Sequence, residues 1–257
     1  MTALAPRITR PTATRIFIRR ALIHAIRDIE TLVMAIALPA ILMVMFTYVF
    51  GGAIDPTGKY VNYVVPGIIL LAAGFGAAST AVSVSRDMTE GLIDRLRAMA
   101  IPQATVVAGH VVASVVRNLI ATVVVLGVAI AVGFRPTASF GEWCAAAGLV
   151  TLYILTITYV FAAIGVLANS PEAASGYGFI LLFLPYLPSA FVPVETMPSW
   201  LQWFAENQPI TPITETLRAL LVGGEGQPWL ALAWTLAVLA GGVAWATWLF
   251  HRRTRAS

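Results

Sequence analysis

The chain has little charge and almost no cysteine for its length. Charged residues make up only 11% of its 257 residues, hydrophobic residues make up 59%, and the mean hydropathy is +0.84. Soluble domains carry about a quarter charged residues, so this composition excludes an ordinary water-soluble fold and favours a membrane protein. The single cysteine, Cys144, excludes an intrachain disulfide and a cysteine-based metal site. The histidines are scattered (His24, His110 and His251) and predict no metal role.

The sequence also lacks the motifs of common enzymes. It has no HExxH pair, no GxSxG elbow and no pair of carboxylates within an apolar run. The stretch GAIDPTGKY approaches an ATP-binding loop, but its glycine spacing is too long and Tyr60 replaces the required Ser or Thr, which favours a turn. Gly74 and Gly76 lie in an apolar run without a preceding strand, which favours close helix packing over dinucleotide binding. We predict no catalytic residue, no ATPase site, and neither a metal nor a cofactor bound by this chain.

Six apolar runs are long enough to cross a bilayer, whose hydrocarbon core needs about twenty mostly apolar residues per helix. They are Thr31–Phe50, Tyr63–Ser85, Val106–Phe134, Trp143–Leu167, Ala173–Val192 and Trp229–Phe250. The fifth is the least regular because it contains Pro185 and Pro188. Spanning helices tolerate proline where neighbours satisfy the freed backbone groups. The sequence therefore predicts an all-α polytopic membrane protein with six transmembrane helices.

The basic residues predict how the spans are oriented, because cytoplasmic loops collect Lys and Arg. With the N-terminus inside, twelve basic residues lie on the cytoplasmic side, three lie outside and Arg117 lies within a span, which accounts for all sixteen. The outer three are Lys59, Arg135 and Arg218. Both termini are then cytoplasmic, as an even number of spans requires. This distribution suits a multi-pass protein of the plasma (cytoplasmic) membrane, contacting lipids, better than a nucleic-acid groove.

Two further segments are neither spans nor simple loops. Residues 15–30 predict a basic amphipathic helix on the anionic inner membrane surface, with a plain solvated leader as the alternative. The outer segment, about residues 193–227, predicts two short helices at Ser199–Glu206 and Ile213–Val222. The predicted organisation is a cytoplasmic N-terminus over residues 1–30, a six-span domain over 31–250 and a basic cytoplasmic tail over 251–257.

Arg117 is the one clear charge inside an apolar run. A charge within the bilayer costs several kcal/mol unless it faces water or a partner, so Arg117 and the adjacent Asn118 form a possible intramembrane polar site. The competing interpretation is geometric. The third run is about 29 residues long, so its first part could protrude and let Arg117 snorkel to the inner headgroups. Both interpretations stay open at the level of sequence.

The stretch SRDMTEGLIDRLRAMAIP, residues 85–102, is a charged island between the second and third runs. Asp87 and Glu90 have the spacing of a capping box, and trailing arginines complement a helix dipole, so we predict a short helix that Pro102 ends. Its apolar stripe consists of Leu92, Ile93, Leu96, Met99 and Ala100. The stripe is too short to span, so it predicts a helix resting on the membrane or in a groove of another protein. A solvated loop is the alternative.

Two motifs resemble a known family. Glu90–Pro102, followed by Val107-Ala108-Gly109, looks like the cytoplasmic motif of ABC-2 type permeases, closest to the daunorubicin-resistance-type exporters of actinobacteria. In the outer segment, the stretch NQPITP over residues 207–212 and then ETLRALLVG over 215–223 resemble the family's Asn-Pro-hydrophobic-Thr and Glu-Leu-Arg stretches. Gln208 departs from that pattern because it separates Asn207 from Pro209. The six-span layout is similar along nearly the whole chain.

The resemblance implies the membrane half of an ATP-driven exporter. Such permeases pair with an identical or a sister permease and with two copies of a separate cytoplasmic ABC ATPase, which binds the ATP and Mg. The island is then the coupling helix, at about residues 87–101. Its candidate coupling residues are Glu90, Gly91, Leu92, Asp94, Arg95, Leu96, Arg97 and Pro102. The candidate outer re-entrant motif, which helps to close the exit, is Asn207, Pro209, Glu215 and Arg218.

We therefore predict the permease subunit of an ABC exporter. Apolar spans with few charges suggest a lipophilic or amphipathic cargo, such as a drug, an antibiotic or a lipid. One alternative is a secondary transporter driven by an ion gradient, although such carriers usually place acids at mid-membrane and the predicted spans hold none. The other alternative is a non-transport membrane protein, such as a scaffold or a lipid-modifying enzyme.

Overall fold

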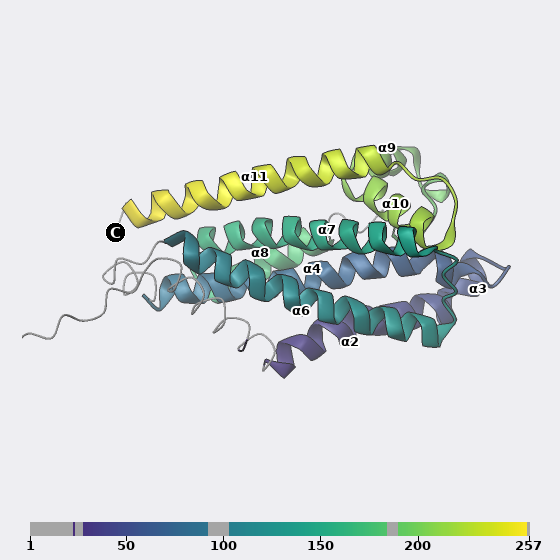
Figure 1. Cartoon of the computed structure of the whole chain (residues 1–257), viewed down its shortest axis with the longest axis horizontal. Coiled ribbons are helices and arrows are strands. Elements are labelled where there is room, and N and C mark those ends of the chain that lie inside the picture. The colour runs from purple at the N-terminus through teal and green to yellow at the C-terminus, as the bar shows by residue number, and fades with distance from the viewer. Residues whose placement is uncertain (1–22, 24–27, 92–102, 184–189, 256–257) are drawn as a thin grey trace, which may run out of the picture.

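The structure, a computed structural model, describes residues 23, 28–91, 103–183 and 190–255. Figure 1 shows long helices running side by side, with short helices gathered at one end. The described part of the chain is all-helical, as predicted. Its helices are α2 (Ile29–Met45), α3 (Gly51–Ile54), α4 (Tyr60–Thr89), α6 (Gln103–Val132), α7 (Phe140–Leu167), α8 (Pro171–Phe183), α9 (Ser199–Asn207), α10 (Ile210–Val222) and α11 (Pro228–Arg255). A π-helical turn, Phe46–Phe50, joins α2 to α3, and a 3-10 turn, Val194–Thr196, precedes α9.

Five of the six predicted spans have a counterpart among the described residues. The helices long and apolar enough to cross a membrane are Ile29–Ile54, Tyr60–Thr89, Ala108–Val132, Phe140–Leu167 and Pro228–Arg253. The fifth predicted span, Ala173–Val192, corresponds to α8, which has 13 residues, followed by residues 184–189, which lie outside the described part. The predicted amphipathic helix over residues 15–30 also lies almost entirely outside it. Both stay predictions.

Local signals explain where the helices begin. The Asp28 carboxylate caps α2, accepting hydrogen bonds from the Thr31 backbone N–H at 3.1 Å and the Thr31 hydroxyl at 2.6 Å. Ser139 and Glu142 form a reciprocal capping box at the start of α7. The GAIDPTGKY stretch contains most of α3 and the predicted turn that leads into α4, and Gly58 adopts a positive φ of 75° in that turn.

The central helix is α4, which packs against α2, α6, α7, α8 and α10. Small residues let its neighbours approach closely. A Cβ atom added to Gly165 of α7 would lie 2.5 Å from the carbonyl oxygen of Ala81 in α4. A Cβ atom added to Gly76 of α4 would lie 1.6 Å from Oδ1 of Asn118 in α6. The prediction of close packing at Gly76 is therefore confirmed.

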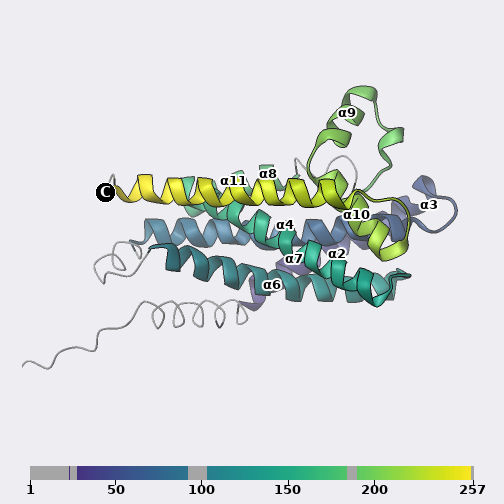
Figure 2. The ribbon, with the colours of Figure 1, turned by 45° about the horizontal axis from the view of Figure 1, so that its top comes forward.

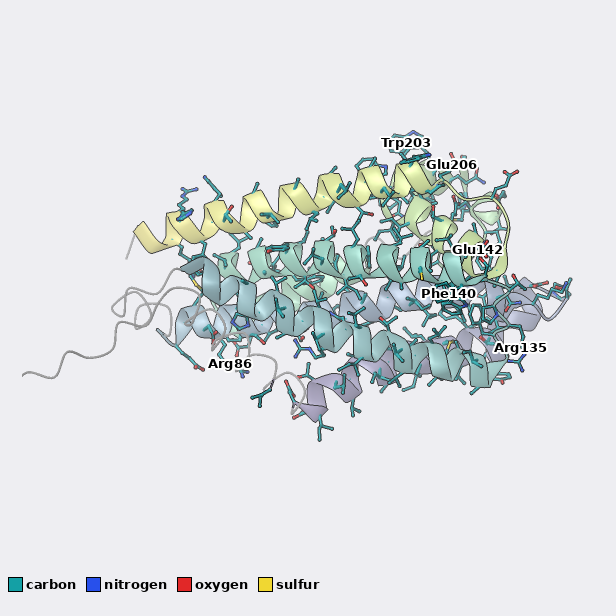
Figure 3. All side chains as sticks on the ribbon, in the orientation of Figure 1. Arg86, Arg135, Phe140, Glu142, Trp203 and Glu206 are labelled. Carbon is teal, nitrogen blue, oxygen red and sulfur yellow. The ribbon has the colours of Figure 1, made fainter. Side chains whose placement is uncertain are left out.

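The bundle has two ends with different character. We call one the loop end; it contains the C-terminal ends of α4, α7 and α11 and the start of α6 (Figure 1). The other is the cap end, formed by α3, α9, α10 and the connections around them. Figure 3 shows Arg86 at the loop end and Arg135, Glu142 and Glu206 at the cap end. The predicted short helices of the outer segment are confirmed as α9 and α10, although α10 begins three residues earlier than expected.

Candidate functional site

At the loop end, α4 reaches further than the sequence suggested. The helix continues through Asp87 to Thr89, Glu90 caps its C-terminus, and Gly91 follows with a positive φ of 71°. The predicted N-cap at Asp87 is therefore wrong, because this residue lies in the last turns of α4. Met88 of the charged island packs against the apolar cluster of Val84, Ala162, Val166 and Phe250, so the helix continues past the first charges. Residues 92–102 lie outside the described part, and with them the coupling candidates Leu92, Asp94, Arg95, Leu96, Arg97 and Pro102.

Asp87 contacts the helix on the far side of that segment. Its Oδ2 atom lies 2.7 Å from Nε2 of His110, which is in the second turn of α6. Both side chains are partly buried, at 24% and 23% exposure, so water screens this contact only in part. The contact joins the two helices that flank residues 92–102. Sequence reasoning missed this pair, because 23 positions separate the two residues and His110 stands in an otherwise apolar run.

A second contact at the loop end holds the start of the 168–170 turn against α11. The Arg253 guanidinium donates to the backbone carbonyls of Val166 and Ala168 and, at 3.1 Å, to Oδ1 of Asn169. Cations suit a helix C-terminus, where the last carbonyls lack intrahelical partners. The ends of α7 and α11 are therefore fixed to each other, separately from the pair that joins α4 and α6.

Arg117 and Asn118 are both buried, but they face different surroundings. Arg117 is 7% exposed, and its Nε atom has no hydrogen-bond partner among the described residues. Asn118 packs against Gly76 and donates through Nδ2 to the Ser114 hydroxyl, 3.2 Å away. The structure does not bring the two residues into one polar site.

At the cap end, Arg218 of α10 binds the first turn of α4. Its guanidinium carbon lies 3.9 Å from the centroid of the Tyr63 ring, and its Nε donates to the Tyr63 carbonyl at 3.2 Å. Burial lowers the pKa of Arg218, while the neighbouring Glu215 carboxylate opposes this shift. Burial likewise raises the pKa of Glu215, and the nearby Arg218 cation opposes it. These opposed shifts indicate two charged groups held in a partly dry environment.

The same turn of α4 makes two more connections. The Tyr60 hydroxyl donates to the Phe191 carbonyl at 2.6 Å, and Oδ1 of Asn62 accepts from the Arg135 backbone N–H at 3.1 Å. The start of α4 is thus bound to three separate pieces of the cap end. The role of Tyr63 could not be read from the sequence, since the residue that it holds lies 155 positions away.

The remaining motif residues occupy the corner between α9 and α10. Asn207 ends α9, Gln208 follows it, and Pro209 precedes α10. Asn207 donates through Nδ2 to the Trp203 carbonyl at 2.7 Å. The structure thus brings Glu215 and Arg218 together on α10 but places Asn207 and Pro209 at its other end. Figure 2 shows α9 standing off the bundle above α10.

Comparisons with known proteins agree with these features. Residues 12–222 match the family described as ABC-2 type transporter. The chain is 30% identical over 222 residues to the daunorubicin resistance ABC transporter permease protein DrrB1 of Streptomyces coeruleorubidus, covering 86% of this chain and 78% of that protein. It is 25% identical over 229 residues to the probable doxorubicin resistance ABC transporter permease protein DrrC of Mycobacterium tuberculosis, covering 82% and 80%.

A more distant similarity points the same way. The chain is 24% identical over 199 residues to ABC transporter G family member 20 of Dictyostelium discoideum, covering 72% of this chain but only 26% of that protein. The match to the family covers far more than half of the chain. Together with the bundle of apolar spanning helices, it establishes that this chain belongs to the ABC-2 type transporter family and is a membrane-spanning permease of an ABC exporter.

Proposed function

We propose that the chain moves a lipophilic or amphipathic molecule outward, using ATP hydrolysed by a separate ABC ATPase subunit. In the five candidate spans, the acidic residues Glu30, Asp87 and Glu142 all lie within a few residues of a helix end. A carrier driven by protons or sodium usually needs acids at mid-membrane. This distribution therefore supports transport driven by ATP hydrolysis in a partner subunit. The names of the relatives suggest a drug or antibiotic as cargo.

The proposed assembly contains two permeases and two ATPase subunits. We place the loop end, together with both termini, in the cytoplasm, because it carries Arg86, Arg252 and Arg253. Residues 15–30 lie along the inner membrane surface. The segment that begins with α8 supplies the sixth span, and α9 and α10 are short re-entrant helices that close the outer exit. Membrane lipids surround the bundle, and ATP and Mg bind only to the ATPase partner.

One observation carries the proposed mechanism: the contact of Asp87 with His110. Residues 92–102 are the proposed coupling helix, with Glu90 and Gly91 at its entry. Because Asp87 and His110 link the flanking helices, a push on this segment by the ATPase moves the ends of α4 and α6 together. The other end of α4 binds Arg218, so the movement reaches α10 at the cap end. The helix α4 acts as a lever between the two ends.

The mechanism is tested by reconstituting the permease with its ATPase and measuring both ATP hydrolysis and transport. Asp87→Asn keeps the size of the side chain and removes the negative charge that faces His110. We expect transport to fall roughly tenfold, with assembly and ATP hydrolysis retained, as a charge-assisted contact is lost. Glu172→Gln at the exposed start of α8 is the matched control and leaves transport unchanged. Normal transport by Asp87→Asn would remove this link from the mechanism.

A second variant tests the coupling helix itself. Asp94→Arg combined with Leu96→Asp reverses one charge and removes one apolar anchor from the proposed groove contact. We expect the ATPase to copurify poorly with this permease, and transport to be lost. If ATPase assembly and transport both survive, the assignment of residues 92–102 as the coupling helix is wrong, whatever the outcome at Asp87.

A further inference from the structure

A cavity lies within this single chain at the cap end. Its volume is about 500 Å³, and its walls come from α7, α8, α9, α10 and α11. That volume falls within the range of about 300–1,000 Å³ that small-molecule sites usually have. The cavity is separate from Arg218 and Tyr63, which lie where α10 meets α4. It is also separate from the loop end, where the proposed coupling takes place.

Aromatic rings form much of the wall. Tyr153 of α7, Trp203 and Phe204 of α9, and Trp234 of α11 all line the cavity. Trp203 and Trp234 are 69% and 38% exposed, so they stand at its mouth, while Tyr153 is 3% exposed and lies deep inside. Trp203 is near the cap end of α11 in Figure 3. No charged side chain is among the described residues of the wall. Rings on several sides favour flat aromatic ligands, which stack face to face or edge to face.

The two amide side chains of the wall, Asn207 and Gln208, lie at the corner between α9 and α10. Gln208 is 6% exposed and donates through Nε2 to the Thr211 hydroxyl oxygen at 2.9 Å. That hydroxyl gives its one proton to the Ala205 carbonyl at 2.5 Å, so its oxygen must accept, which fixes the orientation of the Gln208 amide. Oε1 of Gln208 is then left without a hydrogen-bond partner among the described residues. An unpartnered buried acceptor is costly, and a ligand donor would satisfy it.

Asn207 adds a second acceptor at this corner. One N–H of its amide donates to the Trp203 carbonyl, which leaves the amide oxygen and the second N–H for a ligand. The wall therefore offers acceptors in one place and apolar or aromatic surface elsewhere. The hydroxyls of Thr156 and Thr235 also lie in the wall, and each donates to a carbonyl within its own helix.

We infer that this cavity binds an uncharged, flat aromatic molecule that carries a hydroxyl or amide donor. The rings stack between α7, α9 and α11, and the donor points to Gln208 and Asn207. The inference rests on the proposed export of amphipathic molecules and narrows their chemistry to aromatic amphiphiles held near the exit. Gln208, which departs from the family pattern, becomes a residue that sets ligand specificity.

The test measures binding to the full-length permease in lipid nanodiscs, without ATPase or ATP. The probe is 1-pyrenemethanol, followed by its fluorescence anisotropy, with empty nanodiscs subtracted. Val238→Trp places a large ring in the cavity wall, and Leu236→Trp places the same ring on an exposed face of the same helix, at 52% exposure in the parent chain. We expect saturable binding that Val238→Trp weakens roughly tenfold by filling the space, whereas Leu236→Trp binds like the parent.

Three further arms keep the inference falsifiable if Val238→Trp misfolds. The methyl ether of the probe, which lacks the donor, and the Gln208→Met variant should each weaken binding by roughly fivefold, the effect of one hydrogen bond. A saturated alcohol, 1-hexadecanol, should compete poorly. The inference is overturned if the parent shows no saturable binding, or if the methyl ether and the Gln208→Met variant both bind at full strength. It is also overturned if 1-hexadecanol competes as well as the aromatic probe, because the cavity would then hold a lipid chain. Because no ATPase is present, failed binding leaves the proposed export intact, and failed export leaves this site intact.

Discussion

The helices α4 and α11 look alike in sequence, but α4 lies at the centre of the bundle and α11 lies at its periphery. Both are long and apolar enough to span a membrane, yet 72% of the most apolar stretch of α4 is buried against only 22% of that of α11. Small residues such as Gly67 and Gly76 let neighbours close around α4. Exposed tryptophans such as Trp229 and Trp248 mark the outer face of α11. Apolarity alone therefore does not tell a central helix from a peripheral one.

The difference bears on function because α4 makes polar contacts with other helices near both of its ends. The C-terminal part of α4 contacts His110 of α6, and its first turn binds Arg218 of α10. The most extensive described contacts of α11 are with α7 and α10. A movement of α4 must therefore displace several neighbours, whereas α11 can adjust against lipid. Substitutions at the two helices should separate these roles.

The largest effect is expected where α7 meets α4. Gly165→Ala adds one methyl group 2.5 Å from the Ala81 carbonyl oxygen, which belongs to the rigid backbone of α4. We expect the free energy of unfolding to fall by about 3 kcal/mol, the upper range for overpacking a close-packed site. Unfolding by SDS titration in mixed micelles measures the change. Gly148→Ala on the same helix, where an added Cβ has no neighbour within 4 Å, serves as the control. Equal stability of the two variants would contradict the close contact.

The next effect is expected where α10 binds α4. Arg218→Met keeps the apolar stem but removes the stacking on Tyr63 and the hydrogen bond to its carbonyl. We expect the free energy of unfolding to fall by about 2 kcal/mol, as for the loss of a hydrogen bond to a charged group. The same titration measures it, with the exposed Lys59→Met as control. If Arg218→Met unfolds with the same free energy as the parent, the other contacts alone hold the cap end together.

A smaller effect is expected between α7 and α11. The Thr156 hydroxyl, whose main acceptor is the Leu152 carbonyl, also approaches the Thr235 carbonyl of α11 at 3.3 Å. Thr156→Val should destabilise by about 0.6 kcal/mol, the average for interhelical hydrogen bonds in membranes. Thr151→Val, which removes only an intrahelical bond to Ala147, is the matched variant. If Thr156→Val lowered the free energy of unfolding as much as Arg218→Met does, α11 would have to be counted among the central helices.

The smallest effect is expected on the exposed face of α11. An added Cβ at Gly241 has no neighbour within 4 Å, so Gly241→Ala should leave the free energy of unfolding within about 0.5 kcal/mol of the parent. Activity in the reconstituted exporter should be equally unaffected. A marked loss of transport with normal stability would show that this face packs against another subunit instead of lipid, and would change the role assigned to α11.

Particular residues show how far sequence reasoning reached. The long runs gave the spans because a bilayer demands about twenty apolar residues, and the helices α9 and α10 followed from their own local patterns. The cap at Asp87 was misassigned because a capping box looks the same inside a helix as at its start. Arg218 was singled out by its motif, but not its partner Tyr63. The Gln208 amide stood out only as a departure from a pattern, and its position in a cavity wall needed the fold.

By itself, the sequence determined that this chain is a membrane protein, where most of its spanning helices lie and to which family it belongs. These properties depend on composition and local order along the chain. The tertiary structure decided which span is central, which residues join the flanks of the coupling segment and where a cavity opens. Each of these depends on contacts between residues far apart in sequence, such as Asp87 with His110 and Tyr63 with Arg218. Hydrophobic periodicity carries no information about such pairs, because in a membrane nearly every face of every helix is apolar.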